Sequence, residues 1–192
     1  MSIHYYQENA DAFIADTFGV DMDDAYKPFL SQLAPGSLIL DLGCGSGRDS
    51  LAFSQRGFKV DAIDASSEIA KKASERCGVD VKVKRFDQID EVNHYDAIWS
   101  CASLLHVPEK SLLGILQLIC EALKSGGIMY VSFKYGESQR TVGGRLFTDM
   151  NESKFDVLIG QLEGLSIQKY WLSSDKRPGK SESWLNILVE KQ

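Results

Sequence analysis

Three glycines and a later acidic residue have the types and the spacing that could hold a ligand. Gly43, Gly45 and Gly47 follow a short apolar segment, and Asp64 comes seventeen positions after Gly47. Because glycine has no Cβ, the main chain can turn sharply at these positions and come close to a bound molecule. An acid at the end of the next strand is well placed to accept hydrogen bonds from both hydroxyls of a ribose. These four residues therefore predict a site for a ligand that contains a nucleoside.

The spacing of the glycines separates this site from two other nucleotide sites. A dinucleotide fingerprint has the order G-x-G-x-x-G, but Arg48 occupies the position of its third glycine. A phosphate-binding P-loop ends in Gly-Lys followed by Ser or Thr, and this stretch has no such ending. The pattern therefore disfavours an NAD-dependent oxidoreductase and a P-loop.

A strand, a turn and a helix must hold the glycines in place. The apolar run 38–42, interrupted only by Asp41, predicts a buried parallel strand. Residues 48–56 predict a helix that Gly57 ends, and the start of such a helix offers unpaired N–H groups. Residues 59–64 predict a second strand that ends at the acid. The ligand would then lie against bare backbone at the ends of two strands.

The stretch Leu-Asp-Leu-Gly-Cys-Gly-Ser-Gly at 40–47, together with Asp64, resembles the cofactor-binding half of class I S-adenosylmethionine (SAM)-dependent methyltransferases. The continuation Gly-Ser-Gly-Arg-Asp-Ser is similar to the small tellurite-resistance-like branch of that family. The resemblance extends from Ser37 to the C-terminus. It implies SAM as the cofactor and an α/β, Rossmann-like fold. That fold is a seven-stranded, mostly parallel sheet with an antiparallel last strand and helices on both faces.

The same resemblance implies which residues hold SAM. They are Asp41, Gly43, Cys44, Gly45, Ser46, Gly47, Arg48, Asp64, Ala65, Ser66, Asp87, Ser100 and Tyr6. Asp87 would accept a hydrogen bond from the exocyclic amine of adenine, and a solvated turn is the other interpretation of this residue. Tyr5 or Tyr6 would lie near the methionine end of SAM, or both rings would simply pack the first helix onto the domain.

The length of 192 residues fits one domain, residues 1–192, with a substantial core. Helical patterns at 5–17 and 21–33 form an N-terminal helical cap, residues 1–34, which the resemblance places over the cofactor. Residues 134–150 are polar and contain glycines, which predicts a mobile loop over the active site.

The remaining elements follow from apolar periodicity and turn signals. Helices are expected at 68–77, 109–124 and 152–162, and strands at 79–83, 95–100, 128–133, 167–173 and 184–190. Ser66 or Ser67 is expected to cap the first of these helices, and Gly78 to end it. Pro178-Gly179 marks a hairpin between the last two strands.

The composition limits the kinds of partner and the cellular compartment that we expect for this protein. The net charge of −6 argues against a general nucleic-acid surface, and the sequence has no run of about 18 apolar residues that would enter a membrane. The N-terminus does not have the pattern of a signal peptide. The four cysteines lack the spacing of a zinc site, so no metal is expected, and we interpret them as reduced thiols in a cytoplasmic protein. The sequence alone assigns no oligomeric state.

The loop after the fourth predicted strand, 100–107, should face the transferred methyl group, because ligands of open α/β sheets bind beyond the carboxyl ends of the strands. This loop does not resemble four other methyltransferase classes. It lacks the Asn/Asp-Pro-Pro-aromatic motif of DNA amino-methylating enzymes and the paired glutamates of protein-arginine enzymes. Cys101 lacks the preceding proline of cytosine enzymes and is interpreted as a small buried residue, and Asp96 lies at the wrong end of the strand for a metal-dependent catechol enzyme.

These exclusions leave a small-molecule or small-anion acceptor that is methylated by direct in-line transfer. Candidate acceptor residues are His106, Lys134, Tyr135, Arg145 and Trp184, with Arg140, Arg145 and Arg177 able to attract an anion or to be solvated surface charges. An alternative of another class is a binding module that keeps SAM as a regulatory ligand without turnover.

His106 is the one candidate for a catalytic role. It lies in the loop after the fourth strand, and a histidine with an ordinary pKa can accept a proton near neutral pH. Three roles stay open for it: a general base, a residue that lines the acceptor pocket, or a ring packed under the next helix with one nitrogen bonded to backbone.

Overall fold

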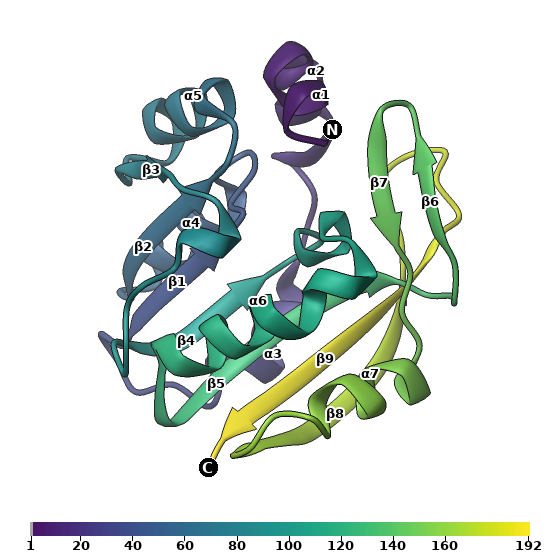
Figure 1. Ribbon diagram of the computed structural model, residues 1–192. Coiled ribbons are helices and arrows are strands. Elements are labelled where there is room, and N and C mark those ends of the chain that lie inside the picture. The colour runs from purple at the N-terminus through teal and green to yellow at the C-terminus, as the bar shows by residue number, and fades with distance from the viewer. Residues whose placement is uncertain (1) are drawn as a thin grey trace.

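The centre of the computed structural model, which describes residues 2–192, is a seven-stranded sheet (Figure 1). Its order is β3-β2-β1-β4-β5-β9-β8. The strands are β1 (Leu38–Leu42), β2 (Lys59–Asp64), β3 (Val81–Val83), β4 (Tyr95–Ser100), β5 (Leu123–Lys134), β8 (Leu165–Ser174) and β9 (Ser183–Lys191). The pairs from β3 to β5 are parallel, and β9 is antiparallel to β5 and β8. The predicted Rossmann-like α/β fold with an antiparallel last strand is confirmed.

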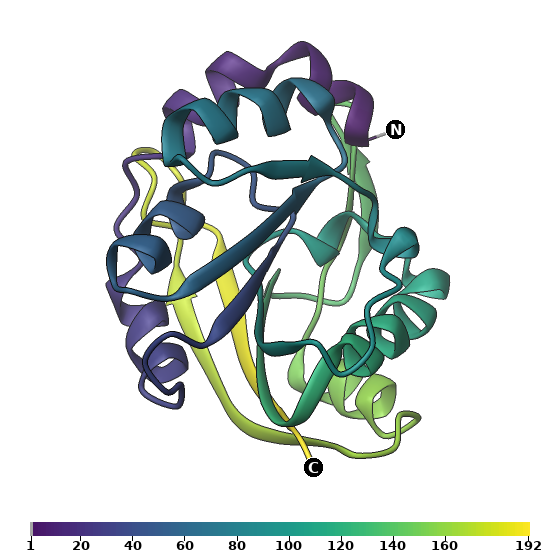
Figure 2. The ribbon, with the colours of Figure 1, turned by 90° about the vertical axis from the view of Figure 1, so that its left-hand side faces the viewer.

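Helices cover both faces of this sheet (Figures 1 and 2). They are α1 (Ser2–Glu8), α2 (Ala10–Thr17), α3 (Asp23–Leu30), α4 (Arg48–Gln55), α5 (Ser67–Cys77), α6 (Glu109–Ala122) and α7 (Glu152–Ile159), with 3-10 turns η1 (Phe86–Gln88) and η2 (Leu104–His106). Side chains alternate between the faces of a strand, so neighbouring residues of β4 enter different cores. Ile98 packs with α6 and α7, whereas Trp99 packs with α3 and α4.

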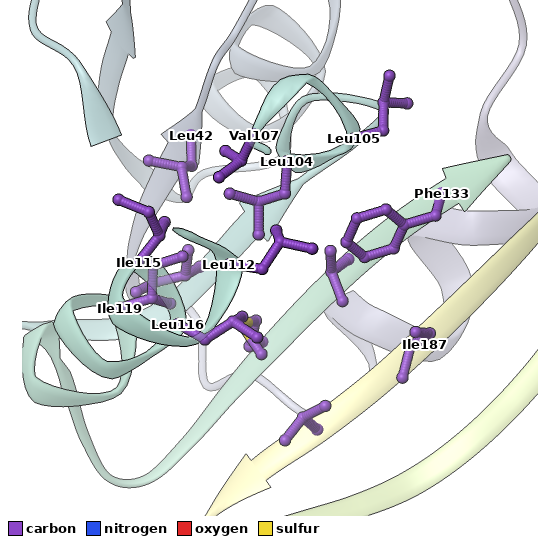
Figure 3. Packing of buried hydrophobic residues seen from close by; sticks show 14 of the residues in the cluster. Leu42, Leu104, Leu105, Val107, Leu112, Ile115, Leu116, Ile119, Phe133 and Ile187 are labelled. Atoms are coloured by element: carbon purple, nitrogen blue, oxygen red, sulfur yellow. The ribbon is translucent and has the colours of Figure 1, made fainter. Parts of the chain in front are cut away.

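The larger core forms where α6 lies on the sheet. Apolar residues recur along α6 at helical spacing, and Leu112, Leu116 and Ile119 are fully buried. Figure 3 shows these side chains pointing from α6 toward the strands, with Phe133 of β5 and Ile187 of β9 on the other side of the core. This packing fixes the loop between β4 and α6, which carries His106, against the sheet.

The helix after β2 begins and ends where its sequence predicts. The Ser66 hydroxyl accepts a hydrogen bond from the backbone N–H of Ile69 at 3.3 Å, and Gly78 ends the helix in the left-handed region at φ +71°. These two caps hold α5 directly behind the acid at the end of β2.

The N-terminal residues form three short helices rather than the two that the sequence predicts, because the first pattern breaks between Glu8 and Ala10. Figure 1 shows α1 and α2 above the sheet, between α5 and β7. Gln7 bonds to both Ser66 and Ser67, and Ser2 bonds to the backbone of Leu146. The segment α1–α2 therefore contacts structure on both sides of the strand ends.

The segment 134–150 differs from its prediction as a loop. It contains an antiparallel hairpin of β6 (Gln139–Val142) and β7 (Arg145–Thr148). Gly143 and Gly144 make the two-residue turn, with φ values of +56° and +77°. Glycine pairs are favoured in such turns because both central residues need positive φ. The mobility expected of this segment stays a prediction.

None of the helices within residues 2–192 combines the length and the apolar character needed to cross a membrane.

Candidate active site

A cavity of about 640 Å³ opens at the C-terminal ends of β1, β2, β4 and β5. Ten of the residues predicted to bind the cofactor or to act in catalysis line it: Tyr6, Gly43, Cys44, Gly45, Ser46, Arg48, Asp64, Ala65, Ser66 and His106. Its opposite wall comes from β5, from the β6–β7 hairpin and from β8 and β9. One side of the cavity therefore carries the glycine motif, and the other carries residues from the C-terminal third of the chain.

The glycine positions of the turn have no room for side chains. Gly43 has φ +76°, and a Cβ added there would lie 2.7 Å from the Cβ of Ser103. A Cβ on Gly45 would lie 3.1 Å from the ring of Phe13. The N–H groups of Gly43 and Cys44 donate to the Ile63 carbonyl, both at 2.9 Å, which ties the turn to β2. The bare backbone of this turn fits a ligand that lies directly against it.

Asp64 stands at the end of β2 with its carboxylate held by backbone. Its oxygens accept hydrogen bonds from the N–H of Gly45 at 3.1 Å and of Ser66 at 2.9 Å. Burial raises the pKa of Asp64 to about 6, although these hydrogen bonds act in the opposite direction and lower it. The carboxylate is thus fixed in direction and still able to accept from a ligand, as binding of ribose hydroxyls requires.

Beneath the turn lies a buried ionic network that sequence reasoning missed. The Asp49 carboxylate accepts from Arg48 Nε at 2.6 Å, from the Tyr26 hydroxyl at 2.5 Å and from Trp99 Nε1 at 2.8 Å. Burial alone would raise the pKa of Asp49, but the Arg48 charge and these bonds hold it below its usual range. No local signal marks Asp49 as the centre of a network, because Tyr26 and Trp99 come from the distant elements α3 and β4. The network fixes Arg48, which lines the cavity.

His106 is held on both ring nitrogens. Nδ1 lies 2.6 Å from the Leu146 carbonyl oxygen, and Nε2 lies 2.7 Å from the Tyr6 hydroxyl. A carbonyl oxygen only accepts, so Nδ1 carries the proton and Nε2 accepts from Tyr6. Burial lowers the pKa of His106 to about 4, although the hydrogen bond to the Leu146 carbonyl acts in the opposite direction and raises it. The ring is therefore neutral, and its only lone pair is already used.

Two of the predicted cofactor residues support the turn from below and do not line the cavity. Asp41 is buried in β1 and accepts from the Ser50 hydroxyl at 2.6 Å, and its burial raises its pKa to about 8. Gly47 precedes α4 with φ +75°, packed so closely that a Cβ would lie 3.2 Å from that of Cys77. Both residues therefore shape the turn, and their part in cofactor binding stays a prediction.

Two further predicted cofactor residues are also outside the cavity lining. Ser100 is fully buried, 2.7 Å from the hydroxyl of Ser103. Asp87 is exposed and pairs with Arg85 at 2.9 Å. Its neighbour Phe86 lines the cavity instead. A tight 3-10 turn sends adjacent residues in different directions, which the sequence pattern did not show.

Of the candidate acceptor residues, the cavity includes Lys134, Arg145, Trp184 and Arg177. Arg140 is directed to Asp149, with which it forms an ion pair, and neither it nor Tyr135 lines the cavity.

The cavity is also lined by four residues from distant elements that the sequence analysis did not predict: Phe13, Phe147, Trp171 and Asn186. Cys101 also lines it, but burial raises the pKa of its thiol to about 12, which fits a small packed residue better than a nucleophile.

The comparisons with known proteins agree with this geometry. Residues 39–127 match a family model described as a methyltransferase domain. A ubiquinone biosynthesis O-methyltransferase of Xanthomonas campestris pv. campestris is 32% identical over 105 residues, which are 51% of this chain. The match spans only 43% of that relative.

Solved structures extend the likeness to nearly the whole chain. The 1,6-didemethyltoxoflavin-N1-methyltransferase of Burkholderia thailandensis, solved with its substrate and S-adenosylhomocysteine (SAH), has a TM-score of 0.79 and 21% identity over 99% of this chain and 85% of its own. The [4+2]-cyclase SpnF has a TM-score of 0.75 and 16% identity over 100% of this chain and 96% of its own. At these identities the two structures establish the fold, which is that of class I SAM-dependent methyltransferases.

Proposed function

We propose that this protein is a methyltransferase that binds SAM in the cavity and transfers its methyl group to a small molecule. One observation carries the proposal. The glycine turn and Asp64 open into the same cavity as the loop after β4 and the wall from β5 to β9. Bound SAM supplies an electrophilic methyl group on a sulfonium leaving group. The protein then contributes chiefly position and the exclusion of water.

Different residues of the cavity would bind different parts of SAM. Asp64 would accept from the two ribose hydroxyls, and the turn residues 43–46, which line the cavity, would lie against the methionine part. Phe86 supplies an apolar wall on the adenine side, where the sequence had placed Asp87. Tyr6 closes the cavity from α1 through its bond to His106.

His106 acts in this proposal as a positioning residue. Its Nε2 lone pair accepts from Tyr6, and its lowered pKa means that the ring holds a proton poorly. A general base would need a free lone pair within hydrogen-bond reach of the acceptor. The structure therefore favours the pocket-lining role among the three that the sequence left open.

A small-molecule acceptor is supported by two of the similar proteins, a ubiquinone biosynthesis O-methyltransferase and a methyltransferase of 1,6-didemethyltoxoflavin. A small-anion acceptor, the tellurite-resistance-like branch and a cytoplasmic location remain predictions from sequence.

Two measurements test the proposal. Calorimetry with SAM, SAH and NAD should show binding of the first two and none of NAD, and binding of NAD alone would reverse the choice of cofactor. A screen of thiols, phenols, amines, carboxylates, selenite and tellurite for release of SAH should then find turnover. Tight SAM binding with no product from any acceptor class would favour the regulatory binding module instead.

A further inference from the structure

Most of the charged side chains that line the cavity neutralise one another. The pairs are Arg48 with Asp49, Arg177 with Asp175 and Asp16, Lys134 with Glu182, and Lys176 with Asp24. Lys180 and Asp21 also line the cavity but are exposed to solvent. Two charged groups of the inner cavity lack an ion-pair partner within residues 2–192: Asp64 on the cofactor side and Arg145 on the opposite wall.

Arg145 is held in place by rings instead of by a carboxylate. Its Cζ lies 4.4 Å from the ring centroid of Tyr5 and 5.2 Å from that of Phe147. Burial raises the pKa of Tyr6, and Arg145 opposes this rise first through a side-chain hydrogen bond and then through its charge, so the guanidinium faces the Tyr6 hydroxyl. Its Nε is buried without a hydrogen-bond partner in the described part of the chain. A guanidinium has five N–H donors, so one that bonds to a single hydroxyl keeps enough of them to bind an oxyanion through two parallel bonds.

The neighbours of Arg145 add no negative charge. His106 is neutral. The Nζ atom of Lys134 lies 4.6 Å from the centroid of the Phe147 ring, and its charge is already paired with Glu182. SAM brings a sulfonium and an ammonium against a single carboxylate, so the bound cofactor adds net positive charge. With the cofactor in place, the cavity therefore needs a negative charge near β7.

We propose that the methyl acceptor is a small planar organic acid whose carboxylate pairs with Arg145. This inference rests on the proposed function, because it concerns the substrate of the same site. The carboxylate accepts from the free donors of the guanidinium, while Phe147 and the half-buried Trp184 provide flat apolar surface for the rest of the molecule. The aromatic surface distinguishes an organic acid from an inorganic oxyanion, which would gain nothing from it.

The test compares acids with their neutral amides in protein saturated with SAH. The probes are 4-hydroxybenzoate, 4-hydroxycinnamate and 4-mercaptobenzoate, each paired with its primary amide, and sodium sulfate as an inorganic oxyanion. Calorimetry on the wild type should show at least one acid binding about tenfold or more tightly than its amide, as a charge-assisted bidentate pair implies. In Arg145→Gln this preference should fall below about twofold while amide affinity stays the same, and Arg145→Lys should keep part of it because the charge remains.

Arg76→Gln is the matched control. Arg76 also stacks on a ring, with its Cζ 4.9 Å from the centroid of Phe18, but it lies outside the cavity lining. It should keep the full preference for acids.

Three outcomes would overturn the proposal. The first is that no acid binds the wild type more tightly than its amide, and the second is that sulfate alone shows the dependence on Arg145. The third is a tenfold loss of SAH affinity in Arg145→Gln, which would assign the guanidinium to the cofactor's own carboxylate. SAH binding by the wild type decides the proposed function separately.

Discussion

The surroundings of Asp64 show how a single residue suits the ligand proposed for it. The fold buries its carboxylate at the end of β2 and gives it backbone N–H groups from Gly45 and Ser66. Because these donors are weaker partners than a cation, burial prevails and the pKa rises to about 6. The residue is thus ionised at neutral pH but close to the point where it gains a proton.

Replacing Asp64 should therefore weaken cofactor binding directly. Asp64→Ala should cost SAM binding about 2–4 kcal/mol, because two charge-assisted hydrogen bonds are lost and the hydroxyls stay poorly paired. Asp61→Ala is the control, since Asp61 lies on the same strand outside the cavity lining. Titration calorimetry measures both, and an unchanged dissociation constant in folded Asp64→Ala would show that the acid does not touch the cofactor.

The raised pKa of Asp64 also predicts how cofactor binding depends on pH. The ionised form binds, and lowering the pH through about 6 protonates it, so affinity is lost on the acid side. Between pH 7 and pH 5 the ionised fraction, and with it SAH affinity, should fall about tenfold. Asp64→Asn should bind weakly with little change over this range. A tenfold loss that persisted in this variant would assign the pH dependence to another group.

His106 gives a second prediction at this scale. Burial lowers its pKa to about 4, so the ring should stay neutral with its proton on Nδ1 throughout pH 5.5–8. Nitrogen NMR of imidazole-labelled protein reports both the tautomer and the titration, with His106→Gln to assign the signal. A His106 signal that titrates near pH 6.5 would return the residue to the list of possible bases.

Among the elements, the strand–turn–helix unit is the part that the sequence predicts best. Gly43 and Gly47 leave little choice of conformation, because both take positive φ and both have close neighbours. The caps of α5 are equally local signals, at Ser66 and Gly78. By contrast, the β6–β7 hairpin was missed because its few apolar residues resemble a polar loop, although Gly143-Gly144 is a turn signal.

A pair of glycine substitutions separates the turn's conformation from its close packing. Gly57 and Gly43 both have left-handed φ, at +86° and +76°, but only Gly43 has a close neighbour. Gly57→Ala should lower the free energy of unfolding by about 1–2 kcal/mol and leave SAH affinity unchanged. Gly43→Ala should cost about 1–3 kcal/mol more through its contact with Ser103, and should weaken SAH binding about tenfold or more. Equal effects of the two substitutions would show that the turn has room to relax.

In the whole molecule, the site depends on contacts between distant parts of the chain. The sequence predicts the sheet, the glycine turn and Asp64 because each is encoded within a few neighbouring residues. It does not predict which of Arg140 and Arg145 faces the cavity, or that Asp49 gathers partners from α3 and β4. Such contacts depend on how the elements pack, and no local pattern encodes them.

The Asp49 network should be a main support of the folded chain. Asp49→Asn leaves the Arg48 guanidinium buried without a charge partner, and should lower the free energy of unfolding by about 3–5 kcal/mol. Asp23 forms an exposed ion pair with Arg56, and Asp23→Asn should lower the free energy of unfolding by less than about 1 kcal/mol. Urea unfolding measures both. A loss below about 1 kcal/mol for Asp49→Asn would mean that Arg48 finds water or another acceptor when its partner is removed.

The placement of the three tryptophans makes the protein its own optical probe. Trp171 and Trp184 line the cavity wall on the acceptor side, whereas Trp99 is buried beneath the turn, stacked on Tyr130 at 3.8 Å. The fluorescence of the two indoles in the wall should change when a flat molecule binds beside them, while the fluorescence of Trp99 should stay constant. In a Trp171→Phe, Trp184→Phe double variant the fluorescence should not respond to ligands. Binding of each ligand on the acceptor side of the wild type could therefore be followed in real time without a label.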